Sequence, residues 1–139
     1  AHAVIEWREN PLDIIPILQH TTHAHSTISL LFYNINGLIY HNLVRGNYRY
    51  VKKNNFHGEH GGLTPISPVD PVALEHALNA QGFNVIHKSG IRTYYDYMTK
   101  ENKQKITEDE HIEMEMQCST LPQFLPNARY LHWLIKPSS

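Results

Sequence analysis

Apolar and β-branched runs alternate with polar breaks along most of the chain, and the clearest example lies in its second quarter. Thr27–Ile35 and Leu38–Val44 are two such runs, with Asn36-Gly37 between them. Asn-Gly in this setting favours a hairpin, because a type I′ turn needs φ > 0 at both central positions. Residues 45–47 predict a second turn before another apolar run, Tyr48–Lys53. The pattern therefore predicts a three-strand meander.

Further strands are expected wherever short apolar runs recur between turn residues. In residues 111–117, Ile112, Met114 and Met116 alternate with polar neighbours, which is the period of a strand with one buried face. The final run suits either a strand or a short helix. The additional expected strands cover residues 1–7, 83–87, 91–98, 111–117 and, at the end, 129–136.

One helix has clear boundary signals. Asp70 can cap its N-terminus, Pro71 suits the first helical position, and Gly82 suits the position after its end. Leu74 and Leu78, together with Ala77, fall on one side and predict its buried stripe, whereas His76 faces away. Residues 12–20 are a second candidate helix, interrupted by Pro16.

These elements predict an α+β fold. We expect one domain over residues 1–139, with a mainly antiparallel sheet of five to seven short strands and one or two helices. Hydrophobic residues make up 41% of the chain, enough for one core, and the net charge of −1 gives no global attraction to nucleic acid or acidic membranes. There is no apolar run long enough for a membrane helix and no secretory pattern, and Cys118 is the only cysteine, so a cytoplasmic location is expected, with a mature secreted chain as the alternative.

Histidine is the unusual residue in the composition, with 11 copies in 139 residues. Imidazole nitrogen binds transition metals such as zinc, and it also transfers protons near neutral pH. One cluster lies in a polar segment before the meander, and the other lies in a long glycine-rich loop over residues 54–69. In both places the alternative is an ordinary solvated surface. The candidate metal ligands are His20, His23 and His25 from the first cluster and His57, Glu59 and His60 from the second.

Two His-x-Ser/Thr tripeptides suggest a different chemistry. The first runs from His25 to Thr27 and the second from His87 to Ser89. This pair resembles the motifs of the two-histidine phosphoesterases over six residues, although Gly90 replaces the apolar continuation that the family has after its second motif. The resemblance implies that the motifs lie on adjacent strands. One histidine would then take a proton from the nucleophile, the other would protonate the leaving oxygen, and the hydroxyls would hold the phosphate.

The span between Asp13 and Glu59 contains no acidic residue. Basic and aromatic side chains interleave within it, and this combination suits single-stranded nucleic acid or nucleotides. The alternative is that the basic strand pairs with the acidic residues 108–115 in the sheet. The candidate substrate-binding residues are Arg45, Arg49, Lys52, Tyr48 and Tyr50.

Taken together, the residues predict a histidine-based enzyme acting on a phosphate-containing substrate such as a nucleotide, a cyclic nucleotide or RNA. His25 and His87 would form the acid–base pair with Thr27 and Ser89, and His57 with His60 is the second choice. The alternatives are a histidine-ligated metal-binding protein and a non-catalytic binding or assembly protein. In the last case the exposed edges of a small sheet would favour homo-oligomers.

Overall fold

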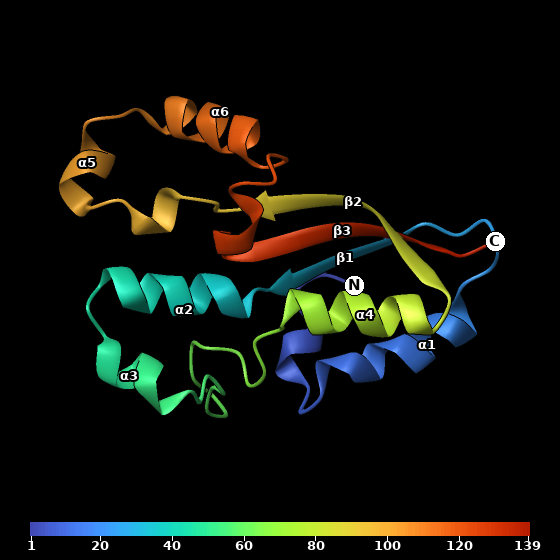
Figure 1. Cartoon of the computed structure of the whole chain (residues 1–139). Coiled ribbons are helices and arrows are strands. Elements are labelled where there is room, and N and C mark those ends of the chain that lie inside the picture. Colours follow the sequence, from blue (N-terminus) through green and yellow to red (C-terminus); the bar gives the residue numbers. More distant parts are fainter.

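The computed structural model describes all 139 residues and contains three strands and six α-helices (Figure 1). The strands are β1 (Ile28–Tyr33), β2 (Phe83–Ile91) and β3 (Tyr130–Pro137). They form one antiparallel sheet in the order β1-β3-β2, so the last strand in sequence lies in the middle. The helices are α1 (Ile14–Thr21), α2 (Ile35–Val44), α3 (Tyr48–Lys53), α4 (Pro71–Ala80), α5 (Lys100–Gln104) and α6 (Glu108–Cys118).

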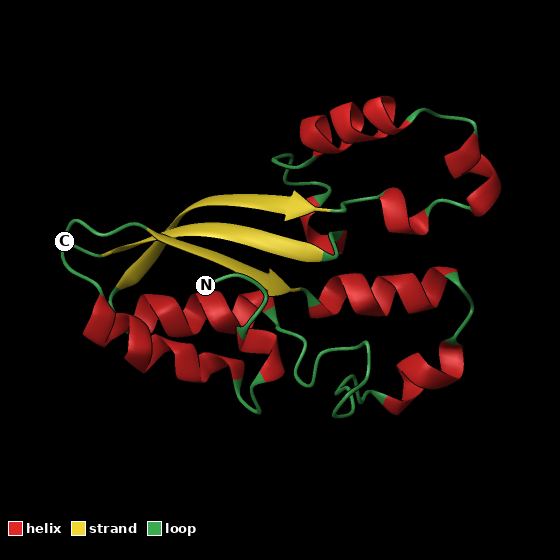
Figure 2. Ribbon diagram, turned by 180° about the vertical axis from the view of Figure 1, so that it is seen from behind, coloured by secondary structure: helices red, strands yellow, loops and turns green.

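Helices α1 and α4 cover one face of the sheet and form the core with it (Figures 1 and 2). Phe32 of β1 and Trp133 of β3 meet edge to face, with ring centroids 4.9 Å apart. Leu74 and Leu78 of α4 are fully buried against the same cluster. Each large apolar side chain removed from water in this way contributes roughly 1.5–3 kcal/mol.

The α4 boundaries confirm the capping prediction. Asp70 accepts hydrogen bonds from the backbone N–H groups of Val72 and Ala73, Pro71 is the first helical residue, and Gly82 has a φ of 84° just past the end. The carboxylate occupies donors that have no partner within the helix, which fixes where the helix begins.

The predicted meander is wrong after its first strand. Asn34 directly follows β1 and caps α2, because its side chain accepts a hydrogen bond from the backbone N–H of Asn36. Asn36-Gly37 therefore lies inside a helix rather than in a hairpin turn. The reason for the glycine is close packing: a Cβ on Gly37 would lie 2.4 Å from the carbonyl oxygen of Ala128. Tyr48–Lys53 is helix α3 and not a third strand.

Three other strand predictions are also wrong. Residues 83–98 form one strand that ends at Ile91 and then a 3₁₀ turn, Tyr95–Tyr97, rather than two strands. Residues 111–117 lie in α6, because Thr107 and Glu110 form a reciprocal capping box at its start. Near the N-terminus only His2 bridges to β1, and Ile5–Trp7 is a 3₁₀ turn. The final run is a strand, β3, as one of the two options predicted.

The α+β class and the antiparallel sheet hold, but the predicted element counts do not. The sheet has three strands instead of five to seven, and helices outnumber strands. Two further 3₁₀ turns, Pro11–Asp13 and Leu125–Asn127, precede α1 and β3. None of the helices has both the length and the apolar character needed to cross a membrane.

Candidate functional site

All three strands have one terminus at the same end of the sheet, where β1 and β2 end and β3 begins. Asn34, fully buried just after β1, joins two of these ends. Its side-chain nitrogen donates to the carbonyl oxygens of Pro126 and Ala128 at 3.0 and 2.8 Å, directly before β3. Loops that lie far apart in the sequence are therefore held together at this end of the sheet, where side chains of different loops can cooperate.

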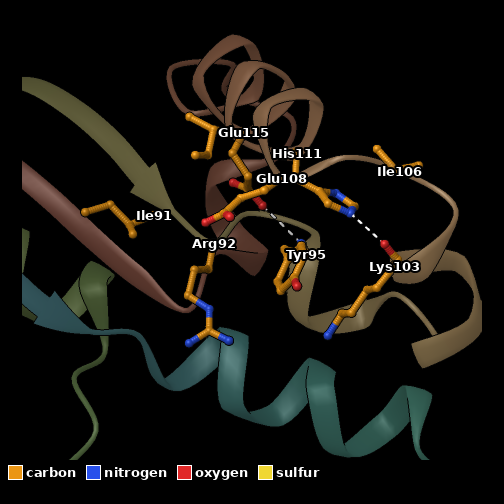
Figure 3. Close-up of a pocket in the computed structure, with 9 residues that line it drawn as sticks. Ile91, Arg92, Tyr95, Lys103, Ile106, Glu108, His111 and Glu115 are labelled. Carbon is orange, nitrogen blue, oxygen red and sulfur yellow. Dashed lines mark hydrogen bonds between the residues drawn. The ribbon is translucent and has the colours of Figure 1, made fainter.

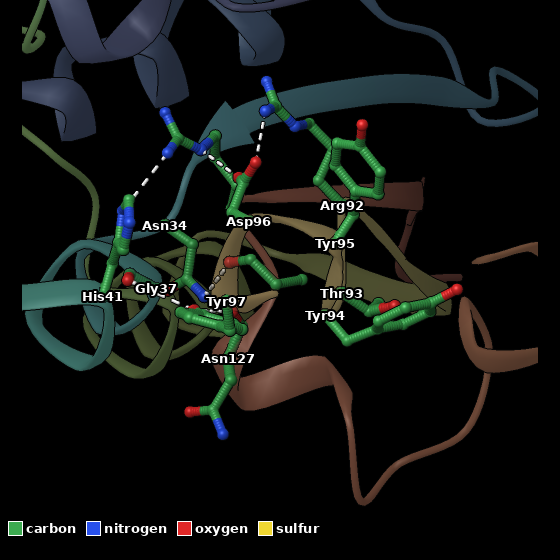
Figure 4. A network of polar contacts seen from close by, with 12 residues as sticks. Asn34, Gly37, His41, Arg92, Thr93, Tyr94, Tyr95, Asp96, Tyr97 and Asn127 are labelled. Atoms are coloured by element: carbon green, nitrogen blue, oxygen red, sulfur yellow. Dashed lines mark hydrogen bonds and ion pairs between the residues drawn. The ribbon is translucent and has the colours of Figure 1, made fainter. Parts of the chain in front are cut away.

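Asp96 organises the charges there. Its carboxylate pairs with Arg92, which follows β2, and with Arg129, which precedes β3 (Figure 4). The Asp96 side chain is only 5% exposed, whereas Arg92 and Arg129 remain 47% and 27% exposed. One buried carboxylate thus orients two guanidinium groups that still reach solvent, and guanidinium is well shaped for phosphate and carboxylate oxygens.

Arg92 also has an unusual backbone conformation, with a φ of 58°. Residues other than Gly, Asn and Asp rarely adopt this left-handed backbone conformation, and holding one there costs on the order of 1–3 kcal/mol. The pairing of Arg92 with Asp96, four residues later, accompanies this turn at the end of β2. Strain of this kind is concentrated at functional sites, and here it falls on a cationic side chain at the strand ends.

Tyr97 and His41 complete the polar network. The Tyr97 hydroxyl donates to the carbonyl oxygens of Asn127 and Gly37, and burial, reinforced by Asp96, raises its pKa to about 12, so it stays protonated at neutral pH. His41 of α2 approaches Arg129 at 3.4 Å between ring and guanidinium nitrogens. Burial, followed by the charges of Arg129 and Arg45, lowers the pKa of His41 and favours its neutral form.

These side chains line an open hollow of about 520 Å³, which we call the cation-rich hollow. Four cationic side chains and a single carboxylate face it, so its field attracts anions although the chain as a whole is nearly neutral. The hollow lies between α2, the turn after β2 and the residue before β3. Its lining consists of His41, Val44, Arg45, Arg92, Asp96, Tyr97, Met98, Thr99, Lys103 and Arg129.

A second hollow of about 580 Å³ adjoins the first, and we call it the isoleucine hollow (Figure 3). Arg92 and Lys103 line both hollows. The remaining lining comes from the end of β2, the turn after it and helix α6. It consists of Ile91, Tyr95, Ile106, Glu108, His111, Ile112 and Glu115.

The predicted catalytic histidines do not come together on adjacent strands. His25 and Thr27 are exposed in the segment before β1, whereas His87 and Ser89 lie on β2. Strand β3 separates β1 from β2, so the geometry that the phosphoesterase resemblance requires is absent. Ser89 instead contacts the backbone carbonyl of His132 at 3.3 Å.

The predicted metal ligands are also dispersed. His20 contacts the Pro16 carbonyl at 2.7 Å and His57 contacts the Ile66 carbonyl at 2.9 Å, each through Nδ1. His23 and His60 are exposed, as is Glu59. No group of three or more His, Cys, Asp or Glu side chains in the structure could hold a metal ion, so the metal-binding prediction, zinc included, is corrected.

Two other histidines do meet, on the sheet face opposite α1 and α4. His2 and His132 both contact the Ser29 hydroxyl through Nε2, at 2.8 and 2.7 Å. Burial and then the neighbouring histidines, His2 and His87, lower the pKa of His132. Neither His2 nor His132 stood out in the sequence, because their contacts depend on the pairing of β1 with β3.

Of the predicted substrate-binding residues, Arg45 lines the cation-rich hollow. Arg49, Lys52, Tyr48 and Tyr50 lie on α3 beside it in the chain, with Tyr48 58% exposed. The expected pairing of this segment with acidic residues 108–115 in a sheet is wrong, since both segments are helices. Arg92, Asp96 and Arg129 were not among the predicted residues. Arg92 and Arg129 lie directly at strand ends, which is their only local signal, and Asp96 has none.

No model of a known protein family matches the chain. The chain is 30% identical over 131 residues to the tRNA 5-carboxymethoxyuridine methyltransferase of Escherichia coli K12, and to the protein of the same name in E. coli O157:H7. The match covers 94% of this chain and 50% of each relative, so the chain spans about half the length of the curated relatives it matches.

This similarity corrects the predicted function. The relatives are methyltransferases, whereas the sequence predicted a histidine-based phosphodiester hydrolase, with a metal-binding or non-catalytic assembly protein as alternatives. The structure gives the physical reason: His25 lies in the exposed segment before β1 and His87 lies on β2, with β3 between these two strands. The chemical groups that do converge are arginines around a buried carboxylate.

Proposed function

We propose that this chain works in a methyltransferase that acts on tRNA, and that its cation-rich hollow receives the RNA. The observation that carries the proposal is the match to tRNA methyltransferases along 94% of the chain, together with four cationic side chains around one hollow. Phosphate contacts from arginine and lysine supply much of the affinity for nucleic acid. Work on tRNA would take place in the cytoplasm.

The modified base named for the relatives suggests a more specific role for the arginines. A 5-carboxymethoxyuridine carries a carboxylate, and Arg92 and Arg129 already bind the carboxylate of Asp96. Both guanidinium groups have further N–H donors, because each has five. We propose that these free donors hold the carboxylate of the modified uridine, while Asp96 keeps the two side chains in position.

Neutral His41 and protonated Tyr97 fit the same role. The lowered pKa of His41 keeps an additional charge out of the hollow, and its Nδ1 accepts from Arg129. Tyr97 lines the hollow, and its hydroxyl donates to the carbonyls of Gly37 in α2 and Asn127 before β3, which ties these two segments together beside it. These residues position the guanidinium groups rather than perform a proton transfer.

The test uses E. coli cells that lack their own tRNA 5-carboxymethoxyuridine methyltransferase and express the natural full-length protein. Nucleosides from their total tRNA are separated and identified by mass spectrometry. The proposal expects methylated 5-carboxymethoxyuridine to reappear. Its complete absence, with the protein folded and abundant, would overturn the proposal.

Matched variants locate the activity on the chain. Replacing the exposed Arg45 of the hollow, Arg45→Gln, removes one contact to an anion and should lower the methylated fraction by roughly tenfold, since hydrogen bonds to charged groups contribute about 1.5–3 kcal/mol. Arg8→Gln removes the same charge from an exposed position that lines neither hollow and should leave methylation unchanged.

A further inference from the structure

The isoleucine hollow continues the cation-rich hollow, because Arg92 and Lys103 form part of both walls. In Figure 3 the side chains of Arg92 and Lys103 extend away from α6 toward α2, on either side of Tyr95. The two hollows therefore form one continuous surface that is cationic at one end. At the other end three isoleucines and Tyr95 provide the apolar part, beside the carboxylates of Glu108 and Glu115. A single-stranded RNA can lie on such a surface with its phosphates on the cationic part and a base on the apolar part.

The apolar wall is exposed and has no cover within the chain. Ile91, Ile106 and Ile112 are 44%, 41% and 51% exposed, although large apolar side chains usually avoid water. Tyr95 lines the same hollow, with the ammonium of Lys103 4.3 Å from its ring centroid. The volume of about 580 Å³ is within the range of small-molecule sites.

Hydrogen bonds fix the backbone of the turn that carries Tyr95. The Glu115 carboxylate accepts from the N–H groups of Tyr94 and Tyr95 at 3.2 and 3.0 Å, and from the N–H and hydroxyl of Thr93. These four donors satisfy the carboxylate, so it serves the fold rather than a ligand. The His111 ring packs edge-on against Tyr95 with centroids 5.0 Å apart, and its Nε2 contacts the Lys103 carbonyl at 3.1 Å.

We propose that the isoleucine hollow binds the base of a nucleotide next to the modified uridine, while Lys103, which lines both hollows, binds the phosphate between the two nucleotides and Arg92 holds the uridine carboxylate. The inference rests on the proposed function, because it takes tRNA as the substrate. A base has apolar faces and polar edges, and single-stranded RNA is recognised by splaying out bases against aromatic and apolar side chains. A detached apolar ligand would leave Lys103, the shared cation that the carboxylate does not use, without a ligand, which is why we favour a nucleotide of the same RNA.

The experiment measures the affinity of the purified full-length protein for three RNAs: a tRNA that carries 5-carboxymethoxyuridine, and two copies with an abasic site directly 5′ or directly 3′ of it. Loss of a stacked base should weaken binding of one abasic RNA by about tenfold. Ile112→Glu places a charge on the apolar wall, and Met114→Glu places the same charge on the same helix at a position of similar exposure outside both hollows.

The expected result is that the wild type and Met114→Glu lose affinity for one abasic RNA, whereas Ile112→Glu binds that RNA and the intact tRNA equally weakly. Equal affinities of the wild type for all three RNAs would overturn the base-binding inference and leave the proposed tRNA function standing. Full sensitivity of Ile112→Glu to the abasic site would overturn it as well. Failure of the wild type to bind the intact tRNA would overturn both proposals.

Discussion

The glycine-rich loop over residues 54–69 and the strand-end cluster around Asp96 make an instructive contrast. The loop concentrates His57, Glu59 and His60 within four residues, yet His60 and Glu59 are exposed and His57 contacts only a backbone carbonyl. Around Asp96, ordinary arginines from two distant segments share one buried carboxylate. Reactive residue types that are close in sequence did not make a site here, whereas the pairing of strands did.

The largest effect should come from the closest packing near the cluster. Gly37→Ala places a Cβ 2.4 Å from the Ala128 carbonyl oxygen, so α2 or the start of β3 must shift. We expect a loss of about 2 kcal/mol in the free energy of unfolding, as for other overpacked positions. Urea denaturation measures it. In the loop, Gly61→Ala meets only open space and suffers from its φ of 81° alone, so it should cost about 1 kcal/mol.

Removal of the shared carboxylate should come next. Asp96→Asn leaves Arg129 half-buried without its counter-ion, and we expect about 2 kcal/mol of destabilisation, between the values for exposed and buried ion pairs. The loop carboxylate gives the control, since Glu59 is exposed and makes no ion pair, so Glu59→Gln should be nearly neutral. Equal urea midpoints for the two variants would remove Asp96 as the organiser of the cluster.

Arg92→Asn separates stability from binding. Asparagine tolerates the left-handed backbone at this position better than arginine does, which offsets the lost ion pair, so the free energy of unfolding should change by less than about 1 kcal/mol. Methylation of tRNA in cells should nevertheless fall by roughly tenfold. His60→Asn in the loop should change neither quantity. A variant of Arg92 that methylates normally would show that the cluster is structural only.

The smallest effect concerns pH. Burial and neighbouring cations lower the pKa of His41 below its ordinary value of 6.5, so the unfolded chain takes up a proton before the folded chain does. Stability from this residue is complete above pH 6.5 and decreases as the pH falls through the folded pKa. Urea midpoints at pH 7.5 and 5.5 should therefore differ less in His41→Asn than in the wild type, with His132, whose pKa is also lowered, contributing to the difference that remains.

Local signals predicted helix boundaries where the capping residues lie next to the helix in sequence. Asp70, Pro71 and Gly82 defined α4 correctly. Thr107 and Glu110 carry the same kind of cap signal for α6, but the alternation of apolar residues in that segment is also typical of a strand. Asn36-Gly37 misled because its glycine serves a contact with Ala128, about ninety residues away in the chain, which no local pattern contains.

The candidate site depended even more on distant contacts. Arg45 was predicted as a substrate-binding residue from the acid-free span, and it lines the cation-rich hollow. Arg92 and Arg129 meet at Asp96 only because β2 and β3 pair, with Ile91 opposite Tyr130. A sequence shows charged residues, but the strand order decides which of them become neighbours.

The central claim is that the cation-rich hollow, and not the histidine loop, binds tRNA. The most direct measurement is the salt dependence of tRNA binding by the double variants Arg45→Gln/Lys103→Gln and His57→Gln/His60→Gln. If the two cations contact phosphates, their removal should reduce the slope of log K against log salt by about 2, whereas the histidine variant should match the wild type. An unchanged slope in the first variant, or a reduced slope in the second alone, would contradict the claim.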